Sequence, residues 1–432
     1  MNFRNLFLII TCFLSSLNYA ADNLYTNSVI LPSNYNMSSA ADPFAFKDAN
    51  GIYYCYVTGK GFPAFISRDL VKWAKSSSNP FPSSGYKWAT ANFWAPEVVK
   101  VGNIYYMHYT GKGADNIMSI GLAQSTSALG PFTDVSDKPF YSMKNKSIID
   151  SHIFFDDDGK AYLFFAKDMS TNYVPGSTTK KRSEIWGIEI KPDLTDTIGP
   201  AKQLFYPSQN WENPNNNDAW NEAPTMIKRN GLYYLMYSAN CYCGNYSVGY
   251  AISRSPLGPW TKYSGNPILK GVTDYVSGTG HNSVVMSPDG TEMICVYHSH
   301  IDLVVKGGNR KINIDRMGFT DAGVMYVDGP TYTPQSYPSA MVSAVDDVKA
   351  EKNRLQITYH SSKKQISFNT PLNSTKVSLY NVNGVLVYSK PLSTEEGLIE
   401  VPVENLGLGI YIVRVENRFS PSVNGMFVKR TN

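Results

Sequence analysis

The feature that most constrains the fold is a short pattern that returns five times: a turn residue followed by a run of aromatic or apolar side chains. The copies begin at Gly51, Asn103, Gly159, Gly231 and Gly290. Each copy is typical of a tight turn leading into the second strand of a hairpin. The copies are roughly 50–70 residues apart, a period that suits propeller blades with variable loops. Because no amphipathic helix separates them, they predict an all-β, five-bladed β-propeller in preference to a sandwich or a barrel.

The pattern stops near Pro330, and the chain changes character after it. Residues 338–354 are small and polar, which is typical of a linker. Residues 355–432 then form a second all-β module, in which Asn383-Gly384 is a strong hairpin signal. We therefore expect a propeller over residues 21–337, followed by a small C-terminal β-sandwich to which we assign no chemistry.

The N-terminus has the pattern of a secretory signal peptide over residues 1–20. Arg4 supplies positive charge, residues 6–14 are largely apolar, and Ala20-Ala21 offers a small-residue cleavage site. The apolar run is too short to span a membrane, and no later stretch is long enough. We expect a secreted or cell-surface protein without a membrane span.

Charge and cysteine content exclude several classes of function. The net charge of +4 is spread along the chain without a basic block, which argues against nucleic acid as a partner. Cys12 leaves with the signal peptide, and the four remaining cysteines are too few for a disulfide scaffold. Cys241-Tyr-Cys243 lacks the spacing of a zinc site. One disulfide is compatible with the sequence, which does not identify its partners.

Acidic residues recur in the strand that precedes each aromatic strand, which in a propeller lines the central channel. These positions hold Asp42, Glu97, Asp150, Glu222 and, in the fifth repeat, His281. A single such acid is more often a turn or cap residue, but repetition in register favours convergence at one mouth of the channel. Clustered, partly desolvated carboxyl groups raise some pKa values, so that one group stays protonated while another stays ionised.

That division of protonation states is what glycoside hydrolysis requires. Acids on separate blades of a wide channel favour a separation that admits a water molecule, and hence an inverting mechanism. Trp94 and Trp220 lie close to acids in the sequence, where an aromatic platform for a sugar is useful; the alternative is a core position.

The ordered set of motifs resembles glycoside hydrolase family 43. The motifs are Ala41-Asp42-Pro43, Trp94-Ala-Pro-Glu97, Ile149-Asp150-Ser-His152, Asn221-Glu222-Ala-Pro224 and Gly280-His281-Asn-Ser283. The resemblance implies that Asp42 is the general base and Glu222 the general acid. It also implies that Asp150 raises the pKa of Glu222 and orients it. Many family members carry Gly after this Glu, so Ala223 leaves the subgroup open.

The resemblance also implies substrate and ion contacts. Trp94, Glu97, Trp220 and Arg310 become candidate substrate-binding residues, although Arg310 is equally compatible with a solvated side chain beside Lys311. His281 becomes a candidate to face a calcium ion, with water molecules completing the coordination shell of the ion. The alternative for His281 is a hydrogen-bonding role. No organic cofactor is expected.

The resemblance points to arabinose- or xylose-containing polysaccharide of plant cell walls, such as arabinan or xylan, as the substrate. Among the activities that the resemblance implies, we expect α-L-arabinofuranosidase activity, with β-xylosidase and endo-arabinanase activity as alternatives. Two alternatives belong to other functional classes: a non-catalytic carbohydrate-binding propeller and a phosphorylase-like enzyme.

The C-terminal module resembles the sorting domain of the type IX secretion system. The residues that carry this resemblance are Val377–Gly384, Leu408–Arg414 and Met426–Arg430. The resemblance implies that secretion machinery is a partner of this module. A generic, carbohydrate-binding β-sandwich is the alternative.

Overall fold

A computed structural model gives the fold of two separate units, residues 1–341 and residues 342–432. It describes residues 24–29, 31, 40–304 and 306–339 of the first unit. In the second unit it describes residues 355, 357–360, 363–370, 374–381, 386–392, 398–407, 409–417 and 423–429. The expected signal peptide, the Asn383-Gly384 turn and most of the expected linker lie outside these residues.

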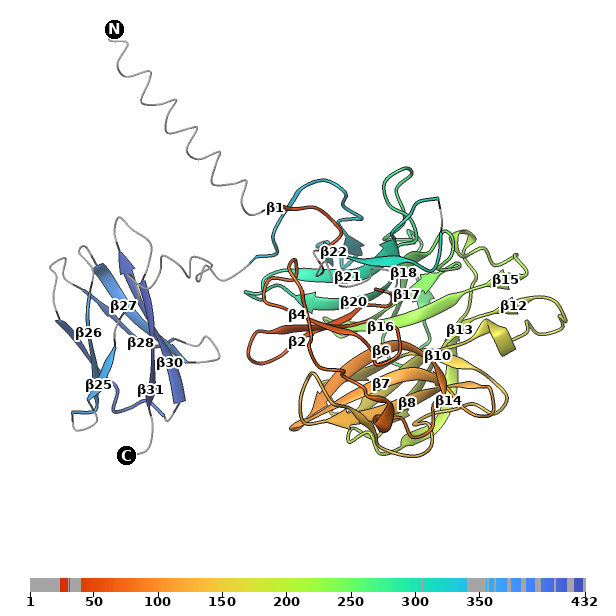
Figure 1. The fold of residues 1–432 in the computed structure, drawn as a ribbon. Coiled ribbons are helices and arrows are strands. Elements are labelled where there is room, and N and C mark those ends of the chain that lie inside the picture. The colour runs from red at the N-terminus through yellow and green to blue at the C-terminus, as the bar shows by residue number, and fades with distance from the viewer. Residues whose placement is uncertain are drawn as a thin grey trace, which may run out of the picture. The chain divides into compact units, whose positions relative to one another are not determined.

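The first unit contains five antiparallel sheets of four strands each, which confirms the five-bladed propeller (Figure 1). Blade 1 is β2 (Phe44–Lys47), β3 (Tyr53–Tyr56), β4 (Ala64–Ser67) and β5 (Ala74–Lys75); blade 2 is β6 (Ala91–Val101), β7 (Ile104–Lys112), β8 (Met118–Ser125) and β9 (Thr133–Asp134); blade 3 is β10 (Ile148–Phe155), β11 (Ala161–Lys167), β13 (Glu184–Ile190) and β14 (Thr197–Phe205); blade 4 is β16 (Asn221–Arg229), β17 (Leu232–Ala239), β18 (Ser247–Ser253) and β19 (Thr261–Lys262); blade 5 is β20 (Gly280–Met286), β21 (Met293–His300), β22 (Arg310–Phe319) and β23 (Met325–Val327).

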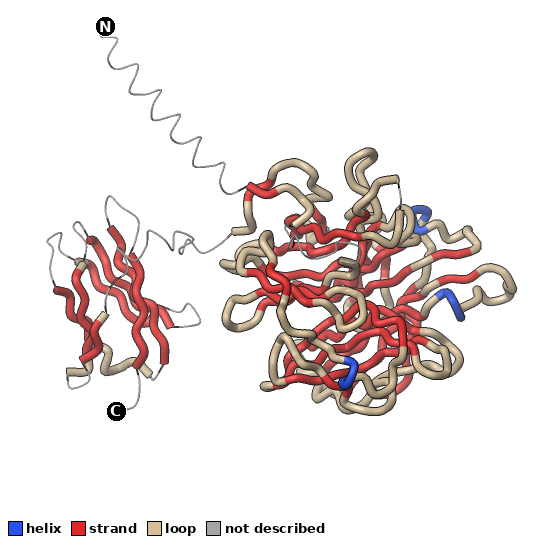
Figure 2. The backbone as a smooth tube through the Cα atoms, viewed as in Figure 1, coloured by secondary structure: helices blue, strands red, loops and turns tan. Residues whose placement is uncertain are grey.

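Helix is almost absent from the part of the chain that the structure describes. Its helices are three single turns of 3₁₀ helix in loops between strands, as Figure 2 shows: η3 (Ser83–Gly85), η4 (Met169–Thr171) and η5 (Asn210–Glu212). None of the described helices has the length and apolar character that crossing a membrane requires.

The first strand of each blade is the innermost one, and these five strands form a ring. β2 contacts β6, β6 contacts β10, β10 contacts β16, β16 contacts β20, and β20 contacts β2. The second strand of each blade is the aromatic strand of the sequence pattern. The acid-bearing segments therefore lie at the start of the strands that line the channel.

The aromatic doublets of the pattern fill the spaces between blades. Because side chains alternate along a strand, neighbouring residues face opposite sides of the blade. Tyr53 packs with Val285 between blades 1 and 5, whereas Tyr54 packs with Val98 between blades 1 and 2. Corresponding apolar clusters separate the other neighbouring blades. Burial of each large apolar side chain stabilises the ring by roughly 1.5–3 kcal/mol.

The N-terminal segment closes the ring by binding to blade 5. The backbone N–H of Val29 donates to the Ile312 carbonyl at 3.0 Å. β1 (Leu24–Tyr25) pairs with β24 (Gln335–Ser336), which follows the last blade. Both ends of the propeller therefore meet at the same blade, and this limits fraying of the terminal strands.

The C-terminal unit contains two antiparallel sheets with a common apolar core. One sheet has β25 (Thr358–His360), β26 (Gln365–Asn369) and β29 (Leu398–Pro402); the other has β28 (Leu386–Pro391), β27 (Ser374–Asn381), β30 (Gly409–Asn417) and β31 (Val423–Lys429). Ile366 and Phe368 of the first sheet share a buried cluster with Val377 and Val413 of the second. This unit is the small β module that the sequence predicts.

Candidate active site

A two-residue bulge near the start of each innermost strand builds the floor of the site. The bulged pairs are Asp42-Pro43, Ala95-Pro96, Asp150-Ser151, Ala223-Pro224 and His281-Asn282. The first residue of each pair has a positive φ, from 43° at Ala95 to 56° at Asp150. A bulge re-aims the side chains beside it. Fivefold repetition of the bulge therefore turns residues of all five blades toward one end of the channel.

The backbone N–H of each bulge binds a side chain of the preceding blade. The acceptors are His298 Nδ1 for Asp42, Thr58 Oγ1 for Ala95, Thr110 Oγ1 for Asp150, Asp150 Oδ2 for Ala223 and Ser238 Oγ for His281, at 2.8–3.2 Å. These bonds form a closed ring that joins every blade to the next. The ring fixes the height of the bulge residues relative to one another.

Two of the five residues that the sequence pattern aligned, Glu97 and Glu222, do not occupy the bulge position in the structure. Ala95 and Ala223 occupy the bulge position, while Glu222 lies one residue before it and Glu97 two residues after it. Residue counting along a strand does not show where the bulge inserts its extra residues. Glu97 therefore has different neighbours from the other acids: its Oε2 lies 2.9 Å from His152 Nδ1 and 3.7 Å from His108 Nε2.

Asp42 is held in its ionised form by groups from blades 1 and 5. Thr58 Oγ1 donates to Oδ2 at 2.5 Å, and Arg310 Nη1 donates to Oδ1 at 3.1 Å. His281 Nδ1 lies 3.3 Å from Oδ1. Burial acts to raise the pKa of Asp42, but the Arg310 guanidinium and the neighbouring histidines hold that pKa well below its ordinary value.

Asp150 and Glu222 are buried close enough to affect each other's protonation. Burial raises the pKa of both carboxyl groups to about 8, and the charges of Glu222 and Asp42 add to the shift at Asp150. The N–H of Ala223 donates to Asp150 Oδ2 at 3.2 Å, and His281 Nδ1 lies 3.9 Å from the same oxygen. Both neighbours favour the charge on Asp150. These contacts oppose, at Asp150, the effect that burial has on both carboxyl groups.

Glu222 is positioned by a tyrosine above it and by a buried network beside it. Tyr246 Oη donates to Glu222 Oε1 at 2.9 Å. The preceding residue, Asn221, donates to Glu212 Oε1 at 3.1 Å and accepts from Lys262 Nζ at 2.9 Å. These contacts fix the backbone at the start of β16 and hence the orientation of the acid.

His281 faces the carboxylates. The described residues contain no group of three or more His, Cys, Asp or Glu side chains arranged to hold a metal ion. A calcium ion binds six to eight oxygens, whereas His281 supplies nitrogen and Oδ1 of Asp42 already accepts from Arg310. The side chains present do not fit a calcium site built from protein ligands. Calcium at His281 stays a prediction of the family resemblance.

The other predicted substrate-binding residues lie at the start of strands around the acids. Trp94, immediately before the bulge of β6, has the position in blade 2 that Glu222 has in blade 4, and it is half-buried. Trp220 is half-buried and directly precedes β16. Arg310 begins β22 and contacts Asp42. The structure thus brings Arg310 to the acids and leaves both tryptophans partly exposed.

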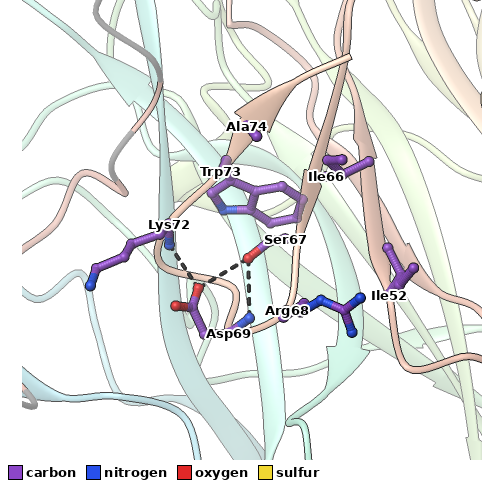
Figure 3. A pocket seen from close by; sticks show the side chains of 8 residues that line it. All are labelled: Ile52, Ile66, Ser67, Arg68, Asp69, Lys72, Trp73 and Ala74. Atoms are coloured by element: carbon purple, nitrogen blue, oxygen red, sulfur yellow. Dashed lines mark hydrogen bonds between the residues drawn. The ribbon is translucent and has the colours of Figure 1, made fainter. Parts of the chain in front are cut away.

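A hollow of about 430 Å³ lies elsewhere, at the turn between β4 and β5 of blade 1 (Figure 3). β4 runs away from the end of the blade that carries Asp42, so the hollow is at the opposite end. Asp69 in its wall accepts from Ser67 Oγ at 3.0 Å and from the N–H of Lys72 at 2.8 Å. This hollow belongs to a hydrogen-bonded turn and contributes nothing to the acid site.

Sequence reasoning missed the residues that hold the acids. Thr58, Thr110, Ser238 and His298 all lie at the ends of aromatic strands, opposite the residue before a bulge. A search for polar residues at the end of each aromatic run would have found these four. Tyr246 follows a loop of irregular length, and the sequence offers no comparable signal for it.

Comparison with known proteins places this arrangement in a family. The family description "Glycosyl hydrolases family 43" matches residues 36–325. The chain belongs to glycoside hydrolase family 43. It is similar to a solved thermostable family-43 glycoside hydrolase at 41% identity and a TM-score of 0.67, covering 73% of this chain and 100% of the other.

Named relatives within this family differ in activity. A β-D-galactofuranosidase from Aspergillus niger is 30% identical over 66% of this chain and 80% of that protein. An endo-1,4-β-xylanase structure from Bacteroides thetaiotaomicron is 32% identical with a TM-score of 0.58, covering 70% of this chain and 97% of the other. The family is settled by these comparisons, and the sugar is not.

The C-terminal unit matches a second family description, "Secretion system C-terminal sorting domain", over residues 360–429. This match confirms the resemblance to the type IX sorting domain. It indicates a secreted or cell-surface family-43 enzyme.

Proposed function

We propose that this family-43 enzyme hydrolyses α-L-arabinofuranosyl linkages of plant cell-wall polysaccharide with inversion. The observation that carries the proposal is the difference between the surroundings of two channel acids. Asp42 is kept ionised by Arg310, whereas burial keeps the proton on Glu222. An inverting glycosidase needs one carboxylate and one carboxylic acid on opposite sides of the scissile bond.

The contacts give each acid a defined reacting oxygen. Because Tyr246 donates to Oε1 of Glu222, the proton is left on Oε2, which faces the leaving group. Glu222 Oε2 donates this proton to the glycosidic oxygen as the bond from that oxygen to the anomeric carbon breaks. Asp42 accepts a proton from the water whose oxygen attacks the anomeric carbon from the other side. By the family resemblance, Asp150 orients Glu222 and raises its pKa.

The substrate is inferred from the relatives. Similar proteins are named as an extracellular exo-α-(1→5)-L-arabinofuranosidase from Streptomyces avermitilis and an α-L-arabinofuranosidase from Humicola insolens, at 24% and 25% identity. The galactofuranosidase relative supports β-D-galactofuranosides as a second candidate. The two sugars share a furanose ring of matching configuration, and galactofuranose has a longer exocyclic arm.

A panel of substrates tests both the site and the class. Wild type, Asp42→Asn and Glu222→Gln are assayed on aryl α-L-arabinofuranoside, aryl β-D-galactofuranoside, aryl β-D-xyloside and linear arabinan. We expect wild type to favour the arabinofuranoside, and each variant to lose about 10²–10⁴-fold in kcat. Proton NMR of the first sugar released is expected to show the inverted anomer. A retained anomer would overturn the inverting assignment.

The same panel separates the alternatives from other classes. A non-catalytic binding propeller would bind arabinan in the wild type and in both variants without turnover. A phosphorylase would release sugar phosphate, and its rate would rise with phosphate concentration. Either result would remove the hydrolytic proposal.

Export through a cleaved signal peptide at residues 1–20 is part of the proposal. The sorting domain supports it, because it indicates that the chain is exported. Mass spectrometry of the exported protein is expected to show an N-terminus close to Ala21. An intact N-terminus on the exported protein would contradict the assignment.

A further inference from the structure

The loop from β17 to β18 contains a very short disulfide-closed ring. Cys241 and Cys243 are bonded across a single residue, Tyr242, and the N–H of Gly244 donates to the Cys241 carbonyl at 2.8 Å. Tyr242 is 45% exposed, an unusual position for a large aromatic side chain. The bridge therefore restricts a loop whose tip presents an aromatic ring to solvent.

The ring of Tyr242 covers the arginine that binds Asp42. The guanidinium carbon of Arg310 lies 4.8 Å from the Tyr242 ring centroid, within the range of a cation–π contact. Arg310 Nη1 donates to Asp42 Oδ1 at 3.1 Å. Arg310 Nε is buried and has no hydrogen-bond partner among the described residues. The Tyr242 ring and the Asp42 carboxylate therefore account for the two contacts that orient this guanidinium.

The backbone of the loop is fixed to blade 5. His300 Nε2 donates to the Tyr242 carbonyl at 2.6 Å, and Ser277 Oγ lies 2.9 Å from His300 Nδ1. Burial lowers the pKa of His300, so the ring is neutral and donates from one nitrogen only. Gly307 packs on the bridge, because a Cβ there would lie 3.1 Å from Cys243 Cβ. Blade 5 thus supports a loop that belongs to blade 4.

The other end of the loop reaches the acid. Tyr246, three residues after Cys243, donates to Glu222 Oε1 at 2.9 Å. One short loop therefore contacts Glu222 directly and reaches Asp42 through Arg310. The conformation of this loop therefore affects both the proposed general acid, Glu222, and the proposed general base, Asp42.

We propose that Tyr242, held by the Cys241–Cys243 bridge, is a positioning residue that keeps Arg310 on Asp42. The inference rests on the proposed hydrolytic function, and it assigns a functional role to a disulfide at the mouth of the channel. The ring excludes water from one side of the guanidinium and opposes its rotation away from the carboxylate. Without the ring, Arg310 swings toward solvent and Asp42 loses part of the charge that keeps it ionised.

The first test uses Tyr242→Ala and Tyr242→Phe, with Tyr275→Ala as the matched control. Tyr275 is also exposed, at 56%, but its ring stacks on Tyr332. With the substrate that wild type cleaves best, Tyr242→Ala is expected to lower kcat/KM about 3- to 30-fold, mainly in kcat. Tyr242→Phe keeps the ring and is expected to retain wild-type kcat/KM, as is Tyr275→Ala.

The pH profile separates positioning from a general structural effect. The charged and titratable groups around Asp42 are Arg310, His281, His298, Asp150, Glu222 and Tyr246. Of these, only Arg310 is displaced by Tyr242→Ala, so the acidic limb of kcat/KM is expected to move to higher pH by at least about 0.5 unit. An unchanged limb together with unchanged kcat/KM would overturn the inference.

The second test addresses the bridge. Dithiothreitol supplies two electrons and two protons to the disulfide and leaves as its cyclic disulfide. Reduction of wild type, verified by thiol titration, is expected to lower kcat/KM about 2- to 10-fold, with no effect on the Cys241→Ser/Cys243→Ser variant. The described free cysteines, Cys55 and Cys295, are buried and form no disulfide that reductant could open. Full activity after verified reduction would overturn the role of the bridge.

Failure of this inference is distinguishable from failure of the proposed function. The Tyr242 and cysteine variants leave Asp42 and Glu222 in place. An enzyme that loses activity in Asp42→Asn and Glu222→Gln, but not in Tyr242→Ala, retains the proposed function and refutes only the role of the loop.

Discussion

Asp150 Oδ2 accepts a hydrogen bond from the backbone N–H of Ala223 at 3.2 Å. This is the one bulge whose N–H binds a carboxylate instead of a hydroxyl or imidazole group of the preceding blade. In the other four blades, the residue opposite the start of the bulge is Thr58, Thr110, Ser238 or His298. In blade 3 that residue is Ala166, which has no acceptor. The carboxylate of Asp150 takes its place and is thereby fixed one residue from Glu222.

Ala166→Ser is expected to disturb this arrangement with little cost to folding. A serine hydroxyl at this position can accept the Ala223 N–H, as Ser238 does for His281. Asp150 would then lose the bond that favours its ionised form. We expect kcat to fall about 3- to 10-fold with KM nearly unchanged, because a shift of the acid affects the chemical step. Steady-state kinetics and a thermal melt check this, and wild-type kcat in a folded variant would contradict it.

Arg310→Met is expected to move the acidic limb of the pH–rate profile to higher pH. Burial acts to raise the pKa of Asp42, and Arg310 is the largest influence that lowers it. Removal of the guanidinium therefore raises the pKa at which Asp42 becomes ionised, and activity is lost at a higher pH on acidification. Measurement of kcat/KM from pH 3 to 9 tests this. Lys311→Met, at the neighbouring position, is the control and is expected to leave the limb in place.

Glu222→Gln is expected to stabilise the enzyme at alkaline pH while abolishing most activity. Burial raises the pKa of Glu222 from 4.5 to about 8. A raised carboxyl pKa means that the folded state binds a proton that the unfolded state releases. Its contribution to stability is present below about pH 4.5 and is lost as pH rises through about 8.

Glutamine carries no such proton, so the melting temperature of Glu222→Gln is expected to exceed that of wild type by about 2–5 °C at pH 8. The difference is expected to vanish near pH 4, where Glu222 is protonated in both states. Differential scanning calorimetry at the two pH values measures it. Equal melting temperatures at pH 8 would show that the proton on Glu222 costs no stability.

Removal of residues 342–432 is expected to leave catalysis unchanged. The two units have separate cores, and the described residues of the second unit bury Ile366, Phe368, Val377 and Val413 against one another. The truncated enzyme is expected to keep the kcat and KM of the full chain but to remain inside the producing cell. Fractionation of cells and medium tests the second point, and export without the C-terminal unit would refute its sorting role.

The sequence by itself determined the propeller and predicted its candidate acids. Alternating aromatic doublets such as Tyr53-Tyr54 fill the spaces on both sides of a blade, and this requirement is local to one strand. It therefore repeats visibly along the chain. Asp42, Asp150 and Glu222 could be singled out because each lies near the start of the strand that precedes an aromatic strand.

Only the tertiary structure decided how those acids are held. The bulges moved Glu97 away from the bulge position and placed Ala95 there, since an inserted residue changes which face a side chain takes. Arg310 reaches Asp42 from the last blade of the propeller, and Tyr242 covers Arg310 from the blade before it. Closure of the ring creates these contacts between distant segments. They leave no periodic trace in the sequence, because each is made once and depends on the positions of all five blades.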